Sequence, residues 1–235
     1  MSTSTRPHTP LPRGDDKRAA VEAMFDRIAP RYDRMNRVIS LGQDARWRRR
    51  AVAALALPQG ARVLDLACGT GDLCRELDSA RYRPVGTDLS HGMLEQAATD
   101  APLVRADAEQ LPFGDAAFDG VICGFALRNF VELDTVFRAC ARVLRQGGRF
   151  VALDAAVPAH LFLRLGNAAW FRGAVPLLGR WFGHDAEAYR YLPRSTAYLP
   201  DPPALLQCLA SAGFGTVERR TMTGGSVQLL VGERS

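Results

Sequence analysis

The feature of this 235-residue sequence that most restricts its fold is an alternation, from residue 61 onward, of short apolar runs with helical segments. Apolar runs of strand length occupy 62–66, 84–88, 103–106, 118–124 and 149–153, and helical periodicity occupies 72–77, 92–98 and 133–144. Strands and helices in this order build a parallel sheet that is buried between helices on both faces. The predicted fold class is therefore α/β, a doubly wound, Rossmann-like and mostly parallel sheet.

Helices precede this alternating region, and a hairpin follows it. Before residue 61, apolar positions three and four residues apart predict helices within 17–57, the first with Val21, Phe25 and Ile28 on one face. Near the C-terminus, a helix over 203–212 precedes apolar runs at 216–222 and 226–232, and glycines between the two runs favour a tight turn. The predicted sheet thus has seven strands, the last two forming an antiparallel hairpin.

The domain organisation follows from the same pattern. Residues 1–16 are rich in Pro, Thr and Ser and lack an apolar core, so they are predicted to be a disordered leader and not a signal peptide. Residues 17–235 are predicted to form a single domain, because a chain of this length can bury one large core. Residues 155–197 form an apolar insertion, and its part 159–182 is expected to be a lid over a ligand pocket.

Composition restricts the partners and the compartment. The net charge is +5, and the basic excess lies within residues 1–60, which suits an anionic partner or a solvated helix face. Five cysteines and four histidines are dispersed without a Cys-x-x-Cys pair, so neither a metal site nor disulfides are expected, and a reducing cytoplasm fits. Pro158, Arg164 and Arg172 interrupt the longest apolar stretch, which predicts contact with a membrane surface without spanning it.

The segment from Asp65 to Asp72 lies between the first predicted strand and its helix. Its glycines, Gly69 and Gly71, let the chain turn sharply and leave backbone N–H groups open to a ligand. A P-loop would need Gly-Lys-Ser/Thr here, and a dinucleotide fingerprint would need a glycine where Cys74 stands. The loop predicts a nucleoside site without a phosphate clamp, and a purely structural turn is the alternative.

Acidic residues mark the ends of three successive predicted strands, at Asp65, Asp88 and Asp107. Because the carboxyl ends of neighbouring strands line one crevice, Asp88 is expected to accept the ribose hydroxyls, and Asp107 with the Ala108 backbone is expected to read an adenine edge. Three carboxylates without a basic phosphate ligand suit a nucleoside that carries a positive sulfonium. Three independent helix caps would be the plainer explanation of the same acids.

Four segments carry a resemblance to a known family. VLDLACGTGDL (63–73) resembles the first motif of class I S-adenosylmethionine-dependent methyltransferases. MFDRIAPRYD (24–33) with Met35 and Asn36, GFALRNF (124–130) and AYRYL (188–192) resemble more specific signatures of the menaquinone/ubiquinone C-methyltransferases. The resemblance spans about 17–232 and implies an enzyme with S-adenosylmethionine as its cofactor, which methylates a ring carbon of demethylmenaquinol or a related prenylated quinol.

The resemblance also implies roles for particular residues. With the glycine loop and the strand-end acids, the expected cofactor-binding residues are Asp65, Gly69, Thr70, Gly71, Asp88, Asp107, Ala108 and Gly124. The residues Tyr32, Arg128 and Asn129 are implied to face the acceptor ring. The sequence departs from the family pattern at Gly124, where the family usually has Ser, and at Asp154 and Ala155, where it has Glu-Phe.

Carbon methylation makes its own chemical demands. A quinol ring carbon becomes nucleophilic when the neighbouring hydroxyl loses its proton, so the site needs a base or an anion-stabilising group and no metal. Arg128 is predicted to stabilise the developing phenolate with Asn129 as its hydrogen-bonding partner, and a surface ion pair is the alternative. His184, Tyr189 and Tyr191 are weaker candidates, for which an exposed loop or core packing is the plainer explanation.

Three other functions compete with this interpretation. A noncatalytic methyltransferase-like binding module would be expected to lose an acid or a glycine of the cofactor site, whereas this chain keeps them. An RNA methyltransferase would add basic patches with exposed aromatic residues, which do not follow residue 60, so no nucleic-acid partner is expected. A small-molecule or natural-product methyltransferase of the same fold is the runner-up.

The sequence leaves several properties open. These are the choice between a naphthoquinol and a benzoquinol, the prenyl length, the identity of the base, and whether the chain forms a homodimer. The expected location is the cytoplasm, with peripheral contact at the inner face of the membrane, because a prenylated quinol is nearly insoluble in water.

Overall fold

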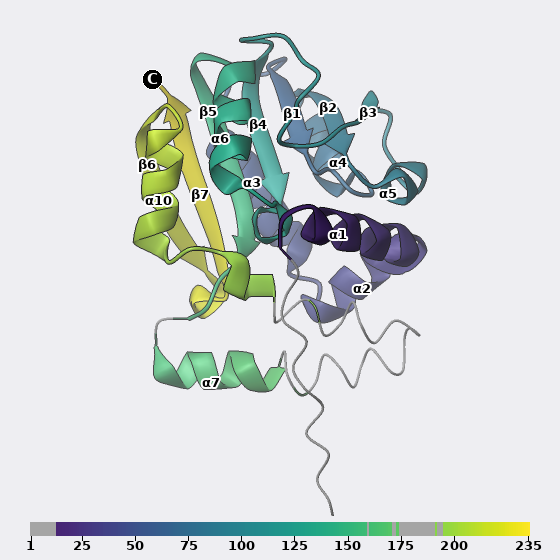
Figure 1. Cartoon of the computed structure of the whole chain (residues 1–235), viewed down its shortest axis with the longest axis vertical. Helices are drawn as coiled ribbons and strands as arrows, with labels where there is room; N and C mark the ends of the chain where they lie inside the picture. The colour runs from purple at the N-terminus through teal and green to yellow at the C-terminus, as the bar shows by residue number, and fades with distance from the viewer. Residues whose placement is uncertain (1–12, 159, 171–172, 174–190, 192–194) are drawn as a thin grey trace, which may run out of the picture.

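The computed structural model describes residues 13–158, 160–170, 173, 191 and 195–235. Its centre is a seven-stranded sheet with the order β3-β2-β1-β4-β5-β7-β6 (Figure 1). The strands are β1 (Arg62–Leu66), β2 (Arg83–Asp88), β3 (Leu103–Arg105), β4 (Phe118–Gly124), β5 (Leu144–Ala155), β6 (Phe214–Met222) and β7 (Val227–Arg234). Neighbours pair in parallel except for β7, which is antiparallel to both β5 and β6. The predicted sheet with its C-terminal antiparallel hairpin is confirmed.

The strand order reverses beside β1. The chain first builds outward from β1 through β2 to β3, and it then returns to place β4 on the other side of β1. The connections after β1 and after β4 therefore diverge at the carboxyl edge of the sheet. A doubly wound sheet leaves its ligand crevice at this point, outside the carboxyl ends of the strands.

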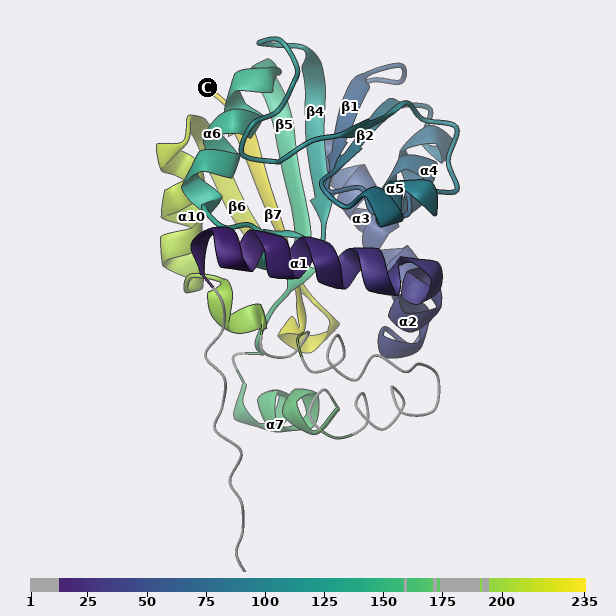
Figure 2. The same ribbon diagram turned by 45° about the vertical axis from the view of Figure 1, so that its right-hand side comes forward.

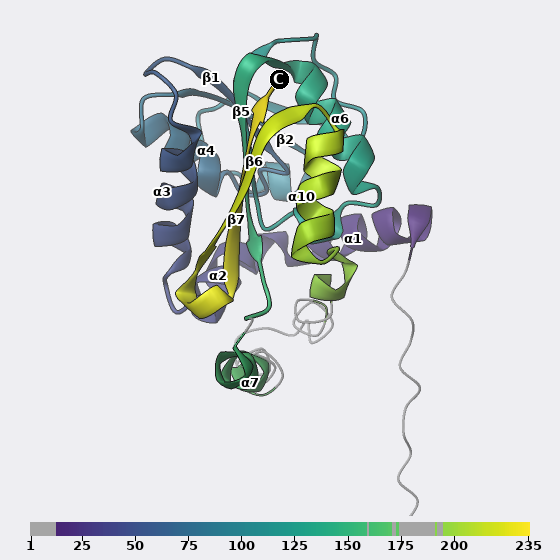
Figure 3. The same cartoon turned by 90° about the vertical axis from the view of Figure 1, so that its left-hand side faces the viewer.

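Helices cover both faces of the sheet. One face carries α3 (Asp44–Leu55) and α4 (Asp72–Ser79), and the other carries α6 (Leu133–Val143) and α10 (Pro202–Ser211) (Figure 3). Successive strand residues point to opposite faces. Accordingly, Val63 packs in the cluster beneath α3 and α4, whereas its neighbour Leu64 packs in the cluster beneath α6.

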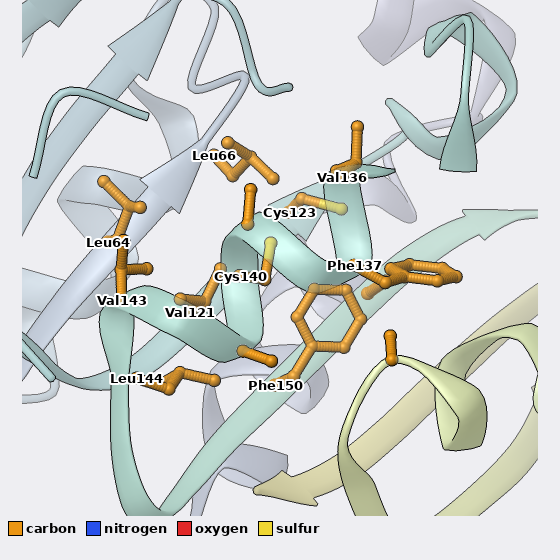
Figure 4. Close-up of a cluster of buried hydrophobic side chains, with 14 of the residues drawn as sticks. Leu64, Leu66, Val121, Cys123, Val136, Phe137, Cys140, Val143, Leu144 and Phe150 are labelled. Carbon is orange, nitrogen blue, oxygen red and sulfur yellow. The ribbon is translucent and has the colours of Figure 1, made fainter. Parts of the chain in front are cut away.

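The α6 side holds the larger aromatic cluster (Figure 4). Phe137 of α6 meets Phe150 of β5 edge to face, with ring centroids 5.5 Å apart, and Phe214 continues the cluster toward β6. All three rings are fully buried. This packing holds the returning strands β4 and β5 against their helix, which makes the carboxyl edge a rigid base for a site.

The N-terminal helices lie across that edge. They are α1 (Gly14–Ile28), the short η1 (Ala29–Arg31) and α2 (Tyr32–Ile39), and α1 runs crosswise past the carboxyl ends of the strands (Figure 2). Pro30 cannot donate a backbone hydrogen bond, so the chain turns there between the two helices. Met24, Ile28 and Met35 form a small core of their own, which fixes α2 against α1.

Some boundaries differ from the prediction. The helix expected over 92–98 is α5 (His91–Glu95), which ends early because the Ala98 N–H donates to the Thr70 carbonyl. Strand β5 begins at Leu144, five residues before the predicted start, because Leu144 already pairs with Phe118. Helix α1 includes residues 14–16 of the predicted leader, and residues 1–12 lie outside the described part of the chain.

The apolar insertion is described only in part. Its described elements are the helix α7 (Leu161–Ala169) and the short η4 (Thr196–Tyr198); η2 (Leu127–Asn129) and η5 (Thr223–Gly225) lie outside the insertion. Half of the predicted lid, together with His184 and Tyr189, lies outside the described residues. Among the helices that are described, none is long and apolar enough to cross a membrane.

Candidate active site

A cavity opens where the strand order reverses, between the carboxyl edge of the sheet and the N-terminal helices. Its wall combines α1 and α2 with the loops that follow β1, β2, β3 and β4. The predicted site residues that line it are Tyr32, Gly69, Asp88, Asp107, Ala108, Gly124 and Asn129. The fold therefore brings together residues from five separate segments of the sequence.

The glycine loop after β1 forms one side of the cavity. Gly69 has φ +54°, and a Cβ added there would lie 3.2 Å from the Met93 methyl group. Gly71 has φ +81°, and a Cβ there would lie 2.8 Å from the Thr99 side chain, which is closer than real Cβ contacts. Both positions require glycine, since L side chains rarely adopt this backbone conformation. The Gly69 backbone lines the cavity, whereas Gly71 is needed for the conformation of the turn.

Asp88 stands at the end of β2 with both carboxylate oxygens oriented by backbone donors. The Gly69 N–H donates to Oδ2 at 2.8 Å, and the Ser90 N–H donates to Oδ1 at 2.9 Å. Burial raises the pKa of Asp88, while these N–H groups favour its charged form and oppose that rise. Each carboxylate oxygen keeps a lone pair, so Asp88 can accept two further hydroxyl groups from a ligand.

Asp107 and Glu109 form an acidic pair in the cavity wall. The Glu109 N–H donates to Oδ1 of Asp107 at 2.9 Å. Arg18 of α1 contacts both acids, with its Nε 2.9 Å from Asp107 Oδ2 and an Nη 2.8 Å from Glu109 Oε2. The guanidinium thereby connects α1 to the loop after β3 and fixes the orientation of Asp107.

Aromatic and amide side chains also line the cavity. Tyr32 and Phe25 pack edge to face with centroids 5.9 Å apart. Burial raises the pKa of the Tyr32 phenol, which keeps it a neutral hydrogen-bond donor. Asn129 lies at the end of η2, where its Nδ2 donates to the Phe125 carbonyl at 3.4 Å and its Oδ1 accepts from the Tyr191 hydroxyl at 3.0 Å. These side chains can pack against a flat, largely apolar acceptor.

Arg128 is buried beside the cavity and does not line it. Its guanidinium forms an ion pair with Asp154, which is fully buried at the end of β5, and its Nε donates to Ser195 Oγ at 3.1 Å. The surface ion pair considered from the sequence is thus a buried one. The charge still lies close enough to lower the pKa of Tyr32 and Tyr191, against the larger effect of their burial.

Three predicted cofactor residues are also absent from the cavity lining that the structure describes. They are Asp65, Thr70 and Gly71. The Thr70 hydroxyl donates to Asp33, and the Cys74 thiol donates to the fully buried Asp65 at 3.2 Å. Burial raises the pKa of Asp65 well above its ordinary value, which favours a protonated acid within the core. In this structure these residues therefore stabilise the glycine loop from outside the cavity lining.

Sequence reasoning missed Arg18 and Met93, which line the cavity. Arg18 precedes its partner Glu109 by 91 residues, and no local signal connects the two. The apolar face of α1 was recognised, but periodicity does not distinguish a face that covers a ligand from one that covers a core. No group of metal ligands occurs within the described ranges.

The charges of the cavity fit a cationic nucleoside. Its described lining carries the carboxylates of Asp88, Asp107 and Glu109, and its single guanidinium, Arg18, is engaged by two of them. Such a set offers acceptors for ribose hydroxyls and for an adenine amine, and it has no free cation for a phosphate. S-adenosylmethionine matches this pattern with its hydroxyls, its amine and its positive sulfur. A seven-stranded, doubly wound sheet with this site defines a class I S-adenosylmethionine-dependent methyltransferase.

Comparison with known proteins narrows the class to a family. The model of the ubiE/COQ5 methyltransferase family matches residues 13–234. The chain belongs to this family.

Two relatives and one solved structure illustrate the similarity. A demethylmenaquinone methyltransferase of Roseiflexus sp. (strain RS-1) is 40% identical over 95% of this chain and 97% of its own length. A demethylmenaquinone methyltransferase of Mycolicibacterium paratuberculosis is 40% identical over 91% of this chain and 94% of its own length. The crystal structure of an S-adenosylmethionine-dependent methyltransferase of Thermotoga maritima superposes with a TM-score of 0.64 at 17% identity, covering 92% of this chain and all of that one. This last likeness concerns the fold alone.

Proposed function

We propose that the protein methylates a ring carbon of demethylmenaquinol. The observation that carries this proposal is the 40% identity, over nearly the full length, to proteins named demethylmenaquinone methyltransferase. The cavity adds chemical support, because its carboxylates suit the cofactor and its aromatic side chains suit a flat quinol ring. Its lining also includes Tyr32 and Asn129, which are hydrogen-bonding groups for the ring oxygens.

The reaction makes one carbon–carbon bond and breaks one carbon–sulfur bond. S-adenosylmethionine supplies an electrophilic methyl group on a positively charged sulfur. On the acceptor, loss of a hydroxyl proton gives a phenolate whose neighbouring ring carbon attacks, and the proton on that carbon leaves afterwards to restore the aromatic ring. The chain must therefore align the ring and stabilise negative charge on its oxygen.

Three residues are proposed for the acceptor end. Asn129 and Tyr32 offer neutral donors to the ring oxygens at the cavity wall. Arg128 acts through its fixed positive charge behind the wall, where its pairing with Asp154 keeps it in one position. Charges that are already oriented stabilise a developing anion without reorganisation, and this is the source of their effect on rate.

We further propose that α7 meets the membrane that holds the quinol. Phe162 is 87% exposed and Leu165 is 60% exposed, and the cation Arg164 is exposed between them. An exposed apolar surface with a cation suits the headgroup region of an anionic bilayer. α7 lies beyond the carboxyl edge of the sheet, on the side where α1 and α2 lie (Figure 2). This supports a peripheral location at the inner face of the membrane.

A direct assay tests the substrate. Purified protein is incubated with S-adenosylmethionine and chemically reduced demethylmenaquinone, and mass spectrometry is expected to detect a product heavier by one methylene unit. The oxidised quinone serves as a control and is expected to remain unmethylated, because it has no hydroxyl to ionise. The quinone pool of a deletion strain is expected to contain the demethylated precursor. An unchanged pool together with methylation of small phenols would favour a small-molecule methyltransferase instead.

A further inference from the structure

Tyr191, from the apolar insertion, reaches the wall of the cavity although it is distant in sequence. Its hydroxyl lies 3.0 Å from Oδ1 of Asn129, which is 62 residues earlier in the chain. Its ring packs with the small core formed by α1 and α2, beside Tyr32 and Trp170. Within the described part of the chain, the phenol is thus held on one side by packing and on the other by its hydrogen bond to Asn129.

The partners of Asn129 determine which way its carboxamide faces. The Phe125 carbonyl can only accept a hydrogen bond, so the nearer amide atom must be Nδ2. The atom beside Tyr191 is then the carbonyl Oδ1, which can only accept, and the Tyr191 hydroxyl must donate. Burial raises the pKa of this phenol, which keeps its proton in place for donation.

This arrangement leaves one donor unused. Nδ2 of Asn129 carries two N–H groups, and among the described residues only the Phe125 carbonyl accepts from it. Asn129 lines the cavity, so its second N–H is available to a ligand. A carboxamide turned the other way would instead present an acceptor, which would repel an anionic oxygen.

We propose that Tyr191 is a positioning residue that holds the Asn129 carboxamide with its N–H toward the acceptor oxygen. The proposal rests on the proposed quinol methylation, and it adds that the site prefers one protonation state of the acceptor oxygen. The cavity favours the deprotonated oxygen of the acceptor over its neutral hydroxyl, because an N–H group forms a stronger hydrogen bond with an anionic oxygen than with a neutral one. Tyr191 therefore assists ionisation of the quinol without touching it.

Removal of the Tyr191 hydroxyl tests this role. Tyr191→Phe keeps the ring and its packing but leaves the carboxamide held, among the described residues, only by its 3.4 Å hydrogen bond to the Phe125 carbonyl. We expect kcat to fall about tenfold, with little change in cofactor affinity. This is less than the roughly 10²–10³-fold loss on removing an oriented donor, because Asn129 itself remains. The rising limb of the pH profile of kcat is expected to move up by about one pH unit, because a tenfold loss of phenolate stabilisation corresponds to about one pKa unit.

Two further variants make the test specific. Tyr82→Phe is the matched control, because the Tyr82 hydroxyl donates to the Leu57 carbonyl at 3.2 Å and Tyr82 is not part of the cavity. It should keep the parental pH profile. Combining Tyr191→Phe with Asn129→Ala should cost no more than Asn129→Ala alone, because both changes remove the same oriented donor. An unshifted profile in Tyr191→Phe, or fully additive losses, would overturn the proposal.

A spectroscopic readout separates this proposal from the substrate assignment. The side-chain amide resonances of Asn129 are assigned by their loss in Asn129→Ala, and they should shift in Tyr191→Phe but not in Tyr82→Phe. If the parent binds cofactor but methylates no reduced quinol, the proposed substrate is wrong. Unchanged Asn129 resonances in Tyr191→Phe would contradict the positioning role whatever the substrate is.

Discussion

The buried pair of Arg128 and Asp154 gives a quantitative expectation for stability. Asp154 is completely buried, and it accepts hydrogen bonds from the Arg128 guanidinium and from the backbone N–H groups of Arg128 and Ala155. Asp154→Ala would leave a buried guanidinium without its counter-charge. Removing one partner of a buried ion pair costs about 3–5 kcal/mol of unfolding free energy. For a chain of this size, that corresponds to a fall in Tm of roughly 6–20 °C.

The physical argument also predicts how the two residues couple. Arg128→Met combined with Asp154→Leu replaces both charges with apolar side chains of similar volume, and such replacements are often nearly neutral. The double variant is therefore expected to be more stable than Asp154→Ala by about 2 kcal/mol or more. Urea unfolding followed by circular dichroism measures each free energy. Asp134→Ala, which breaks the exposed Arg138–Asp134 pair, is the control and should cost about 0.5 kcal/mol or less.

Two outcomes would refute this reasoning. A loss of unfolding free energy below about 1 kcal/mol in Asp154→Ala would mean that water reaches the guanidinium, so that the charge is not buried without a partner. Losses in Arg128→Met and in Asp154→Leu that simply add in the double variant would mean that the two charges do not depend on each other. Activity of the folded double variant is a separate question: a loss of about a hundredfold in kcat is expected if the charge of Arg128 stabilises the phenolate.

Three further expectations concern the cofactor, the pH dependence and the membrane. Asp88→Ala should weaken S-adenosylmethionine binding in calorimetry by about ten- to a hundredfold, the effect of losing charge-assisted hydrogen bonds, and parental affinity in a folded variant would contradict the ribose assignment. Burial lowers the pKa of Lys17 from 10.5 to about 8, so the folded state binds fewer protons than the unfolded state across this interval. The parent should therefore gain stability relative to Lys17→Met as the pH rises from about 8 to about 10.5, and a constant difference in urea midpoints would rule this out. Phe162→Glu should reduce sedimentation with anionic liposomes more than Gln146→Glu, an equal charge change at an exposed site in β5; equal effects would exclude α7 as the contact.

The sequence was sufficient for those features that arise within a few neighbouring residues. Strands β1 and β4 have the predicted extents, because their apolar runs and their flanking turns are local. The glycine loop and the acid at Asp88 were found because the connection from strand to helix places them at the carboxyl edge in any doubly wound sheet. The specific family signatures then supplied the reaction class.

Tertiary structure decided which of these residues share a cavity, which of them are buried, and which partners they have. Arg18 meets Asp107 because α1 crosses the edge of the sheet, and Arg128 meets Asp154 because β5 pairs beside β4. No periodic pattern in the sequence indicates either contact, because each joins two segments that are distant along the chain. Likewise, the orientation of the Asn129 carboxamide depends on the Phe125 carbonyl and on Tyr191, which returns to it from the insertion. Burial and the direction of a hydrogen bond depend on all the surrounding segments at once, and only the folded chain specifies them.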